Sequence, residues 1–272
     1  MLSKPGIFVS AFHIFHEGSG LKVQLDHVSV TQIRMYLRCP AQYYFRYVKG
    51  LKVPPPGAIV LGRAVHSGLE YCFKEKMEKT EAPPVNRILD VYDAAFEAER
   101  PEADWREEDP GRAKDDGVAL LKLHYQEVAP HLVPAAVERR VEIPMEKENT
   151  HLLGFIDLET ADGFIVDHKT VSRTPPEDKA AEDIQLSAYA LAYRRAHGKM
   201  PNGVRLDFLV RNKTAKIVTR SAQRTEADLL RFWKLAKGVV RAIQGEMFYP
   251  NPDNFMCSPA GCGYWEECHR MF

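Results

Sequence analysis

Two aspartates and a lysine stand out in residues 154–170, which read GFIDLETADGFIVDHKT. Asp157 lies in one apolar run, and Asp167 and Lys169 follow the next. Side chains of a strand alternate between its two faces, so Asp167 and Lys169 share a face. Two carboxylates beside a lysine are costly to bury without a function. A divalent metal would supply one by neutralising the carboxylates and activating water. A surface cluster of ion pairs is the alternative interpretation.

A β-hairpin must position these residues, because the turn dipeptide Asp162-Gly163 separates the two apolar runs. Asp157 and Asp167 can share a metal only if they face the same side of this hairpin. A two-residue loop would place Asp157 opposite His168, and Asp167 would then point away. A three-residue loop that ends in a left-handed Gly163 places Asp157 opposite Asp167. We expect the second register.

A long helix is predicted at residues 58–79, and it carries the segment LGRAVHSGLE. Gly62, His66 and Glu70 lie four residues apart, which places them on one face of this helix. A single histidine on a helix is more often structural than a metal ligand, so the spacing leaves the role of His66 open.

Basic and aromatic side chains alternate in residues 29–52, where Ser29 and Gln32 predict a capping box at a helix start. This mixture is typical of surfaces that bind single-stranded nucleic acid, because bases stack on aromatic rings and phosphates attract cations. The candidate substrate-binding residues are Arg34, Arg38, Tyr43 and Arg46. The alternative is an amphipathic core helix with a solvated basic face.

Three of the five cysteines cluster in the C-terminal segment 250–272: Cys257, Cys262 and Cys268. A tetrahedral zinc or a cysteine-ligated iron–sulfur cluster needs a fourth ligand. Cys39 fits, because it precedes Pro40 at an expected helix break, and a helix N-terminus favours a thiolate. Cys72, inside the long helix, is predicted to be a buried apolar residue. His269 is an alternative ligand for zinc.

Composition limits the class of protein. The chain has 272 residues, 45% of them hydrophobic, which is enough for one large domain or two small ones. Lys plus Arg and Asp plus Glu both number 37, which excludes a uniformly basic surface but not a local basic groove. No apolar stretch is long enough to span a bilayer, and no secretory cleavage pattern is found. The cysteines suit metal ligation more than disulfides, so we expect the protein to occupy a reducing, cytoplasmic environment.

The expected architecture is α/β, with a central mixed β-sheet flanked by helices. We expect an N-terminal arm or extra strand in residues 1–28 and one domain in residues 29–272. This domain would include a helical insertion at 81–134 and the cysteine-ligated segment 250–272. The expected helices occupy residues 29–38, 39–47, 58–79, 86–100, 111–128, 179–196 and 225–244. The expected strands occupy residues 136–147, 152–158, 164–169, 204–211 and 215–220.

The order of motifs along the chain resembles a known family. CPAQYYFRY, LGRAVHSGLE, GFIDL, VDHKT and QLSAY precede the cysteine-rich segment. This combination resembles the PD-(D/E)xK nucleases of the RecB-like exonuclease group. Within it, the pattern is most similar to the iron–sulfur nucleases that include the CRISPR adaptation nuclease and the AddB-type nuclease domain. The resemblance covers residues 29–272 except the insertion, and it implies a restriction-endonuclease-like core.

The resemblance also implies roles for individual residues. His66, Asp157, Asp167 and the backbone carbonyl of His168 would bind Mg²⁺ or Mn²⁺. Lys169 would be the catalytic lysine, acting beside the two aspartates. Gln185 and Tyr189 match the Q-x-x-x-Y motif, which orients the site or the substrate.

Four cysteines match the ligands of a 4Fe–4S cluster in that family: Cys39, Cys257, Cys262 and Cys268. The gap between Cys257 and Cys262 is wider than the family's usual C-x2-C spacing. Zinc therefore stays open as the occupant of this site.

The function expected from these residues is metal-dependent cleavage of DNA, by an exonuclease acting on single-stranded ends. The resemblance places it in DNA repair or CRISPR adaptation, with a helicase or integrase as a possible partner protein. One alternative is a catalytically silent DNA-binding or structural subunit of a helicase–nuclease or CRISPR adaptation complex. Another is an iron–sulfur redox protein, although an electron carrier has no need of the Asp167-x-Lys169 pair.

Overall fold

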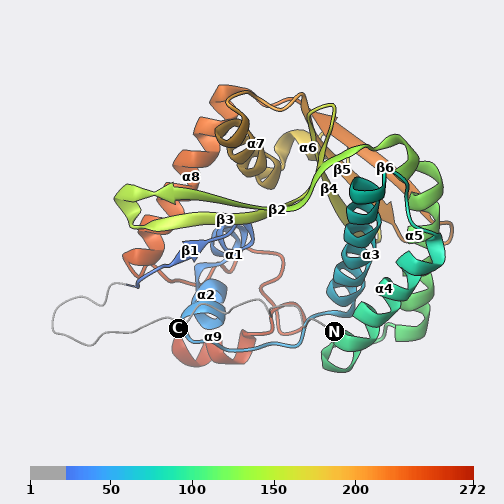
Figure 1. Cartoon of the computed structure of the whole chain (residues 1–272). Coiled ribbons are helices and arrows are strands. Elements are labelled where there is room, and N and C mark those ends of the chain that lie inside the picture. The colour runs from blue at the N-terminus through green and yellow to red at the C-terminus, as the bar shows by residue number, and fades with distance from the viewer. Residues whose placement is uncertain (1–22) are drawn as a thin grey trace. The chain divides into compact units, whose positions relative to one another are not determined.

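The structure, a computed structural model, describes residues 23–272, and these residues form a six-stranded mixed sheet and the helices beside it (Figure 1). Its strand order is β1-β3-β4-β5-β6, with β2 paired to β3. The strands are β1 (His27–Val28), β2 (Pro134–Met145), β3 (Thr150–Thr160), β4 (Phe164–Val171), β5 (Gly203–Val210) and β6 (Lys216–Ala222). The β1–β3 and β4–β5 pairs are parallel, and the β3–β4 and β5–β6 pairs are antiparallel. The predicted α/β class with a mixed sheet flanked by helices is confirmed.

The chain divides into two compact units. The first, here called the sheet unit, consists of Pro54–Val141 and Gly154–Phe232. The second, here called the termini unit, consists of the described residues up to Val53 together with Glu142–Leu153 and Trp233–Phe272.

Helices cover both faces of the strands in the sheet unit. On one face lie α3 (Gly57–Lys79), α4 (Val85–Glu99) and α5 (Pro110–Glu127), which run side by side in Figure 1. Their buried apolar residues form one core with residues of β3, β4 and β5, among them Phe73, Tyr92, Leu121, Leu158, Val166 and Leu209. The other face carries α6 (Lys179–Glu182) and α7 (Ile184–His197). Short 3₁₀ turns follow α4 at Arg100–Glu102 and α5 at Ala129–His131.

The termini unit joins segments from both ends of the chain. It contains α1 (Val30–Arg38), α2 (Pro40–Tyr43), a π-helical segment (Tyr44–Val48) and α9 (Trp265–Met271). It also contains most of α8 (Glu226–Gln244) and the 3₁₀ turn Glu146–Glu148. The buried carboxylate of Glu148 accepts hydrogen bonds of 3.0 and 2.6 Å from the Arg241 guanidinium. This charge-assisted pairing offsets the cost of burying Glu148.

Most predicted elements are confirmed because their signals are local. Ser29 and Gln32 form the predicted capping box, with bonds of 2.7 and 3.2 Å. Cys39 is the N-cap of α2, and Pro40 is its first residue, as expected. The helices predicted at 58–79, 86–100, 111–128 and 225–244 are present with ends shifted by a residue or two.

Three features differ from the sequence-based expectation. The helix predicted at 179–196 is broken, because the Asp183 side chain accepts the Gln185 N–H at 2.8 Å and starts α7 anew. Helix α9 in the C-terminal segment was not predicted. Strand β2 contains Glu138 at a φ of +49°, a left-handed bend inside a strand.

The expected arm at residues 1–28 lies mostly outside the described residues, and residues 27 and 28 form β1. Residues 81–134 are helical, with α4 and α5 contributing to the core of the sheet unit. That this region is an insertion stays a prediction. In the described part of the chain, no helix is long and apolar enough to cross a bilayer.

The hairpin has the predicted register. Leu158 pairs with Val166 and Glu159 with Ile165, so Asp157 lies opposite Asp167. The loop is Ala161-Asp162-Gly163, and Gly163 has the predicted positive φ, +81°. The Gly163 N–H donates to the Thr160 carbonyl at 2.9 Å and closes the loop.

A side chain at Gly163 should strain this loop. A Cβ there would be 3.1 Å from Asn202 Nδ2, and L-residues resist left-handed backbone. We expect Gly163→Ala to lower the free energy of unfolding by about 1–2 kcal/mol, measured by urea denaturation. Gly238→Ala is the control, because Gly238 lies inside α8 with open space around it. Equal stability of both variants and the wild type would contradict the role given to Gly163.

Candidate active site

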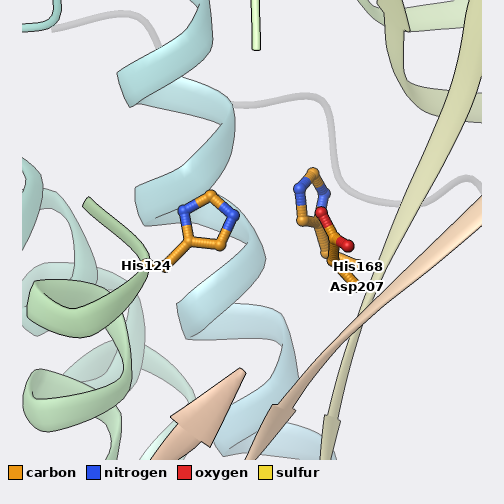
Figure 2. A group of neighbouring side chains, drawn as sticks. All are labelled: His124, His168 and Asp207. Carbon is orange, nitrogen blue, oxygen red and sulfur yellow. The ribbon is translucent and has the colours of Figure 1, made fainter. Parts of the chain in front are cut away.

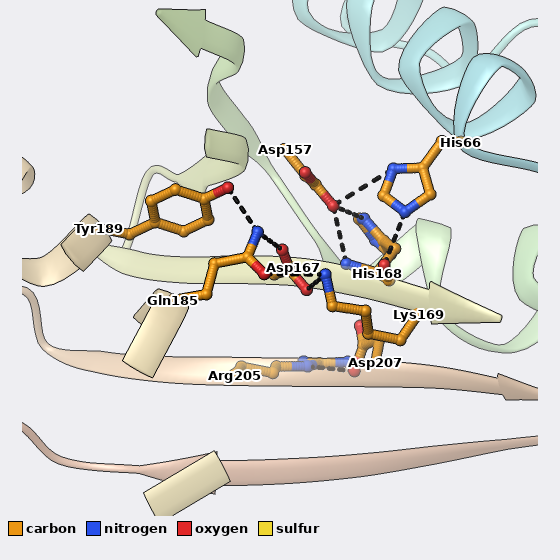
Figure 3. Close-up of polar contacts among 9 residues, drawn as sticks. All are labelled: His66, Asp157, Asp167, His168, Lys169, Gln185, Tyr189, Arg205 and Asp207. Carbon is orange, nitrogen blue, oxygen red and sulfur yellow. Dashed lines mark hydrogen bonds and ion pairs between the residues drawn. The ribbon is translucent and has the colours of Figure 1, made fainter. Parts of the chain in front are cut away.

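A buried ion pair lies at the centre of the site (Figure 3). The Lys169 ammonium is 2.7 Å from Asp167 Oδ2, and Asp167 is completely buried. Both residues lie on β4 and, through the alternation of the strand, on the face covered by α7. Oδ2 accepts no well-formed hydrogen bond from the described residues despite this contact. The carboxylate therefore keeps a lone pair available for another cation.

Side chains of helix α7 contact both Asp167 and Lys169. Gln185 Oε1 accepts from Lys169 Nζ at 3.2 Å, and Gln185 Nε2 donates to Asp167 Oδ1 at 3.0 Å. The same amide nitrogen lies 2.6 Å from Tyr189 Oη, one helical turn further on. Burial raises the pKa of Tyr189 well above its usual value, so the phenol stays neutral. The predicted Q-x-x-x-Y residues thus meet the predicted carboxylate and lysine.

Asp157 links β3 to β4 and to helix α3. Its Oδ2 accepts the backbone N–H of His168 at 2.8 Å. The same oxygen is 3.4 Å from His66 Nδ1, and His66 is carried by α3. The other ring nitrogen, His66 Nε2, is 2.7 Å from the carbonyl oxygen of His168. Three of the predicted metal-binding groups therefore converge, and the predicted ligand atom of His168 is its carbonyl oxygen.

Glu138 joins this group, although the sequence did not single it out. One ligand atom from each of His66, Glu138 and Asp157 lies within 4.8 Å of the others. A small pocket is lined by these residues together with Leu69, Glu70, Phe73 and His168. The backbone at Glu138 is left-handed, which interrupts the regular alternation of side chains along β2, as bulges do beside functional sites. The sequence signal was slight: three consecutive charged residues, Glu138–Arg140, inside a predicted strand.

The two aspartates have opposite pKa shifts. Burial acts to raise the pKa of Asp157, but His66, the His168 side chain and Lys169 outweigh it and hold this pKa well below the usual value. Burial raises the pKa of Asp167 to about 6, with Lys169 opposing the shift and Asp157 adding to it. Burial also acts to lower the pKa of Lys169, but both carboxylates outweigh it and raise this pKa. The site thus contains a firmly ionised carboxylate, a carboxylate that resists ionisation, and an ammonium group.

The predicted substrate-binding residues lie in the termini unit and have different exposures. Arg38 and Arg46 are exposed, and Arg34 is half-buried. Tyr43 is fully buried, with its ring packed against those of Tyr36, Tyr47 and Phe248. The prediction that a base stacks on Tyr43 is therefore wrong, because no face of its ring reaches solvent.

The four candidate cofactor ligands also lie in the termini unit. Cys39, Cys262 and Cys268 contact one apolar cluster with Ala41, Phe45 and Tyr264. Burial raises the pKa of the Cys257 and Cys268 thiols, and neighbouring cysteines, Cys39 and Cys262 among them, add to both shifts. In the described residues, however, the cysteines do not form a group of three or more ligand atoms within 4.8 Å of one another.

Cys72 is separate from these four cysteines. It lies buried in α3, and burial raises its pKa to about 11. This agrees with the expectation that Cys72 is an apolar core residue.

Comparisons with known proteins give the family and the fold. A family model described as the PD-(D/E)XK nuclease superfamily matches residues 27–269. No curated protein sequence matches the chain. Among solved structures, the chain is similar to one from Eubacterium rectale described as a "Putative exonuclease". The TM-score is 0.60 at 12% identity, covering 91% of this chain and 88% of that one. At this identity the likeness shows the fold alone.

A second solved structure, that of SSO0001, has a TM-score of 0.39 at 13% identity, covering 79% of this chain and 96% of that one. This score is too low to support any inference. The resemblance seen in the sequence is confirmed for the superfamily, whereas the iron–sulfur subgroup stays a prediction. Because the family match spans nearly all of the 272 residues, the chain belongs to the PD-(D/E)XK nuclease superfamily.

Proposed function

We propose that the protein hydrolyses phosphodiester bonds of DNA with the aid of a divalent ion, Mg²⁺ or Mn²⁺. One observation carries the proposal: on the neighbouring strands β3 and β4, Asp157 contacts His66, and Asp167 and Lys169 contact Gln185, with His66 and Gln185 coming from distant parts of the chain. A structural ion pair would not require a histidine, an amide and a second carboxylate to converge on it. Membership of a nuclease superfamily supports the same conclusion.

The residues at the site fit a hard divalent ion. We propose that His66, Asp157, Asp167 and the His168 carbonyl bind it, with Glu138 as a further ligand. Carboxylate and carbonyl oxygens are the ligands such ions prefer. The buried Asp167 Oδ2, which lacks a well-formed hydrogen bond, also suits a cation. A bound ion would neutralise the carboxylates and make hydroxide from water.

Lys169 has the position needed to act on the substrate. Asp167 and Gln185 fix its ammonium at 2.7 and 3.2 Å, so little conformational entropy is lost when a phosphate arrives. The raised pKa keeps this group protonated at neutral pH. A fixed positive charge beside a phosphate offsets the negative charge that develops during attack. We propose that Lys169 serves this purpose and helps to orient the attacking water.

The proposed substrate is single-stranded DNA, cut from its ends. Exposed Arg38 and Arg46 could contact the phosphates of any DNA, and the single-strand preference rests on the mixture of basic and aromatic side chains in residues 29–52. Because Tyr43 is buried, base stacking on Tyr43 does not contribute to this preference.

Removal of the lysine should stop cleavage. We expect Lys169→Met to slow the cutting of labelled single-stranded DNA in Mn²⁺ by about 10²–10⁴-fold, because a fixed charge at the reacting phosphate is lost. DNA affinity should change little, since one charge among several contacts is removed. The control is Lys213→Met, which removes an exposed lysine. Double-stranded DNA is tested in parallel to measure the strand preference.

Two outcomes would contradict this proposal. Wild-type cleavage that is equally fast in EDTA would exclude a metal-dependent reaction. A Lys169→Met variant as active as Lys213→Met would remove the role assigned to the lysine.

Glu138 should contribute to metal affinity. We expect Glu138→Gln to weaken Mn²⁺ binding about tenfold, because a charged ligand becomes neutral. Isothermal titration measures this change without turnover. Glu146→Gln, which neutralises an exposed glutamate just after β2, is the matched control. The same Mn²⁺ affinity in both variants would show that Glu138 is not a ligand.

We further propose that Cys39, Cys257, Cys262 and Cys268 bind one 4Fe–4S cluster, with zinc as the alternative occupant. The support is the clustering of three of them in residues 250–272 and the shared apolar surroundings of Cys39, Cys262 and Cys268. The Gln42 amide also donates to Cys262 Sγ at 3.3 Å, the kind of bond that tunes cluster sulfurs. This cofactor would support placement in the iron–sulfur subgroup.

Loss of one of these thiols should affect stability. Such a site would close a loop of about 220 residues and, by the loop-entropy estimate, stabilise the fold by about 5 kcal/mol. Cys257→Ser should therefore lower the thermal midpoint and the iron and sulfide content of anaerobically purified protein. Cys72→Ala is the control, because Cys72 lies apart from the site, in α3. Wild-type protein with neither iron nor zinc would refute the proposal, and zinc without iron would identify the alternative occupant.

A further inference from the structure

A second polar group lies on the opposite face of β4, buried in the sheet unit (Figure 2). It consists of His124 from α5, His168 from β4 and Asp207 from β5, each at most 2% exposed. One ligand atom from each residue lies within 4.8 Å of the others. We propose that these three residues bind one transition-metal ion of the zinc class, at a site separate from the candidate active site. Neither the nuclease activity nor the cysteine site is needed for this proposal.

The main observation is a set of buried polar atoms without partners. His124 Nδ1 and Nε2, His168 Nε2 and Asp207 Oδ2 have no hydrogen-bond partner among the described residues. A buried polar atom that lacks a hydrogen-bond partner destabilises the fold, because its lost hydration is not replaced. Six other buried side-chain atoms of the described residues also lack a partner, but these four differ in lying together in one group of metal-ligating side chains. A single ion would satisfy one atom of each residue at once.

In two of the three side chains, the second polar atom contacts a neighbouring protein group. Asp207 Oδ1 accepts hydrogen bonds from Arg205 Nε at 2.7 Å and from Thr219 Oγ1 at 2.8 Å. His168 Nδ1 lies 3.6 Å from Asp157 Oδ2. In both cases the opposite atom, Asp207 Oδ2 or His168 Nε2, is the unpartnered one. Metal ligands are commonly oriented in this way, with a carboxylate behind the histidine and donors behind the carboxylate.

The fold brings the ligands together without flexible segments. His168 and Asp207 are direct neighbours in the parallel β4–β5 register. The Phe73 ring stacks on His168 with centroids 5.7 Å apart and meets His124 edge-on at 5.9 Å. Burial lowers the pKa of His124 well below its usual value, and His168 and Arg205 add to the shift. The imidazole is therefore neutral, which is the form that binds a metal.

The donor set indicates which ion would bind. Two imidazole nitrogens and one carboxylate oxygen suit Zn²⁺, which binds such ligands with water in a fourth position. A hard ion such as Mg²⁺ prefers oxygen ligands throughout. The Arg205 charge opposes any cation here, but Asp207 neutralises it through Oδ1.

Such an ion would link α5 to strands β4 and β5, on the face of β4 opposite Asp167 and Lys169. The backbone N–H and carbonyl of His168 contact Asp157 and His66 on the active-site side, while its ring would contact the ion. The ion would therefore act as a positioning element for that stretch of backbone.

Metal content tests the proposal on the full chain. Wild type, His124→Asn, Asp207→Asn and the control His131→Ala are exposed to Zn²⁺ in excess Mg²⁺, dialysed and analysed for zinc. His131 is an exposed histidine in the turn after α5. We expect wild type and His131→Ala to retain one more zinc per chain than the other two variants, because each of those loses one ligand. Equal zinc in all four proteins would overturn the proposal and leave water as the occupant.

A second measurement does not depend on the folding of buried variants. In wild-type protein labelled with ¹⁵N-histidine, Zn²⁺ should shift the ring nitrogens of His124, which is assigned through its contact with Phe73. The ring of His131 should not change. Unshifted His124 nitrogens at saturating Zn²⁺ would overturn the proposal even if both variants failed to fold.

Discussion

The left-handed turn at Gly163 is the constraint on which the candidate active site depends. It fixes a three-residue loop, and the loop fixes the pairing of β3 with β4. Because side chains alternate with a period of two, a slip of one residue would turn Asp157 away from Asp167. The two aspartates lie on different strands, so only the strand pairing can bring them to the same face. One backbone conformation therefore determines whether the carboxylates can share an ion.

The alternation along β4 also explains why one short segment supports two polar groups. Asp167 and Lys169 face α7, whereas the side chain of His168, between them, faces α3 and α5. The backbone of His168 remains on the active-site side, where Asp157 and His66 contact its N–H and carbonyl. On each face one aspartate is paired with a cation: Asp167 with Lys169, and Asp207 with Arg205. Such pairing is required, because uncompensated buried charges cost several kcal/mol.

Helices α7 and α3 complete the site. The start of α7 determines where the Gln185 side chain lies. Asp183 interrupts what would be a continuous helix and starts α7 two residues before Gln185. The amide of Gln185 can then contact both Asp167 and Lys169. Helix α3 brings His66 to the other side of the same strands. A residue that caps a helix thus helps to orient the groups proposed to do the chemistry.

The sequence by itself determined the features that depend on neighbouring residues. These include the hairpin loop, the capping box at Ser29 and most helix boundaries, because turn chemistry and hydrophobic periodicity act over a few residues. The motif resemblance added the grouping of His66 with the aspartates. Only the tertiary structure decided where Glu138, His124 and Asp207 lie, and that Tyr43 is buried. Those outcomes depend on contacts between segments far apart in the chain, which no local pattern records.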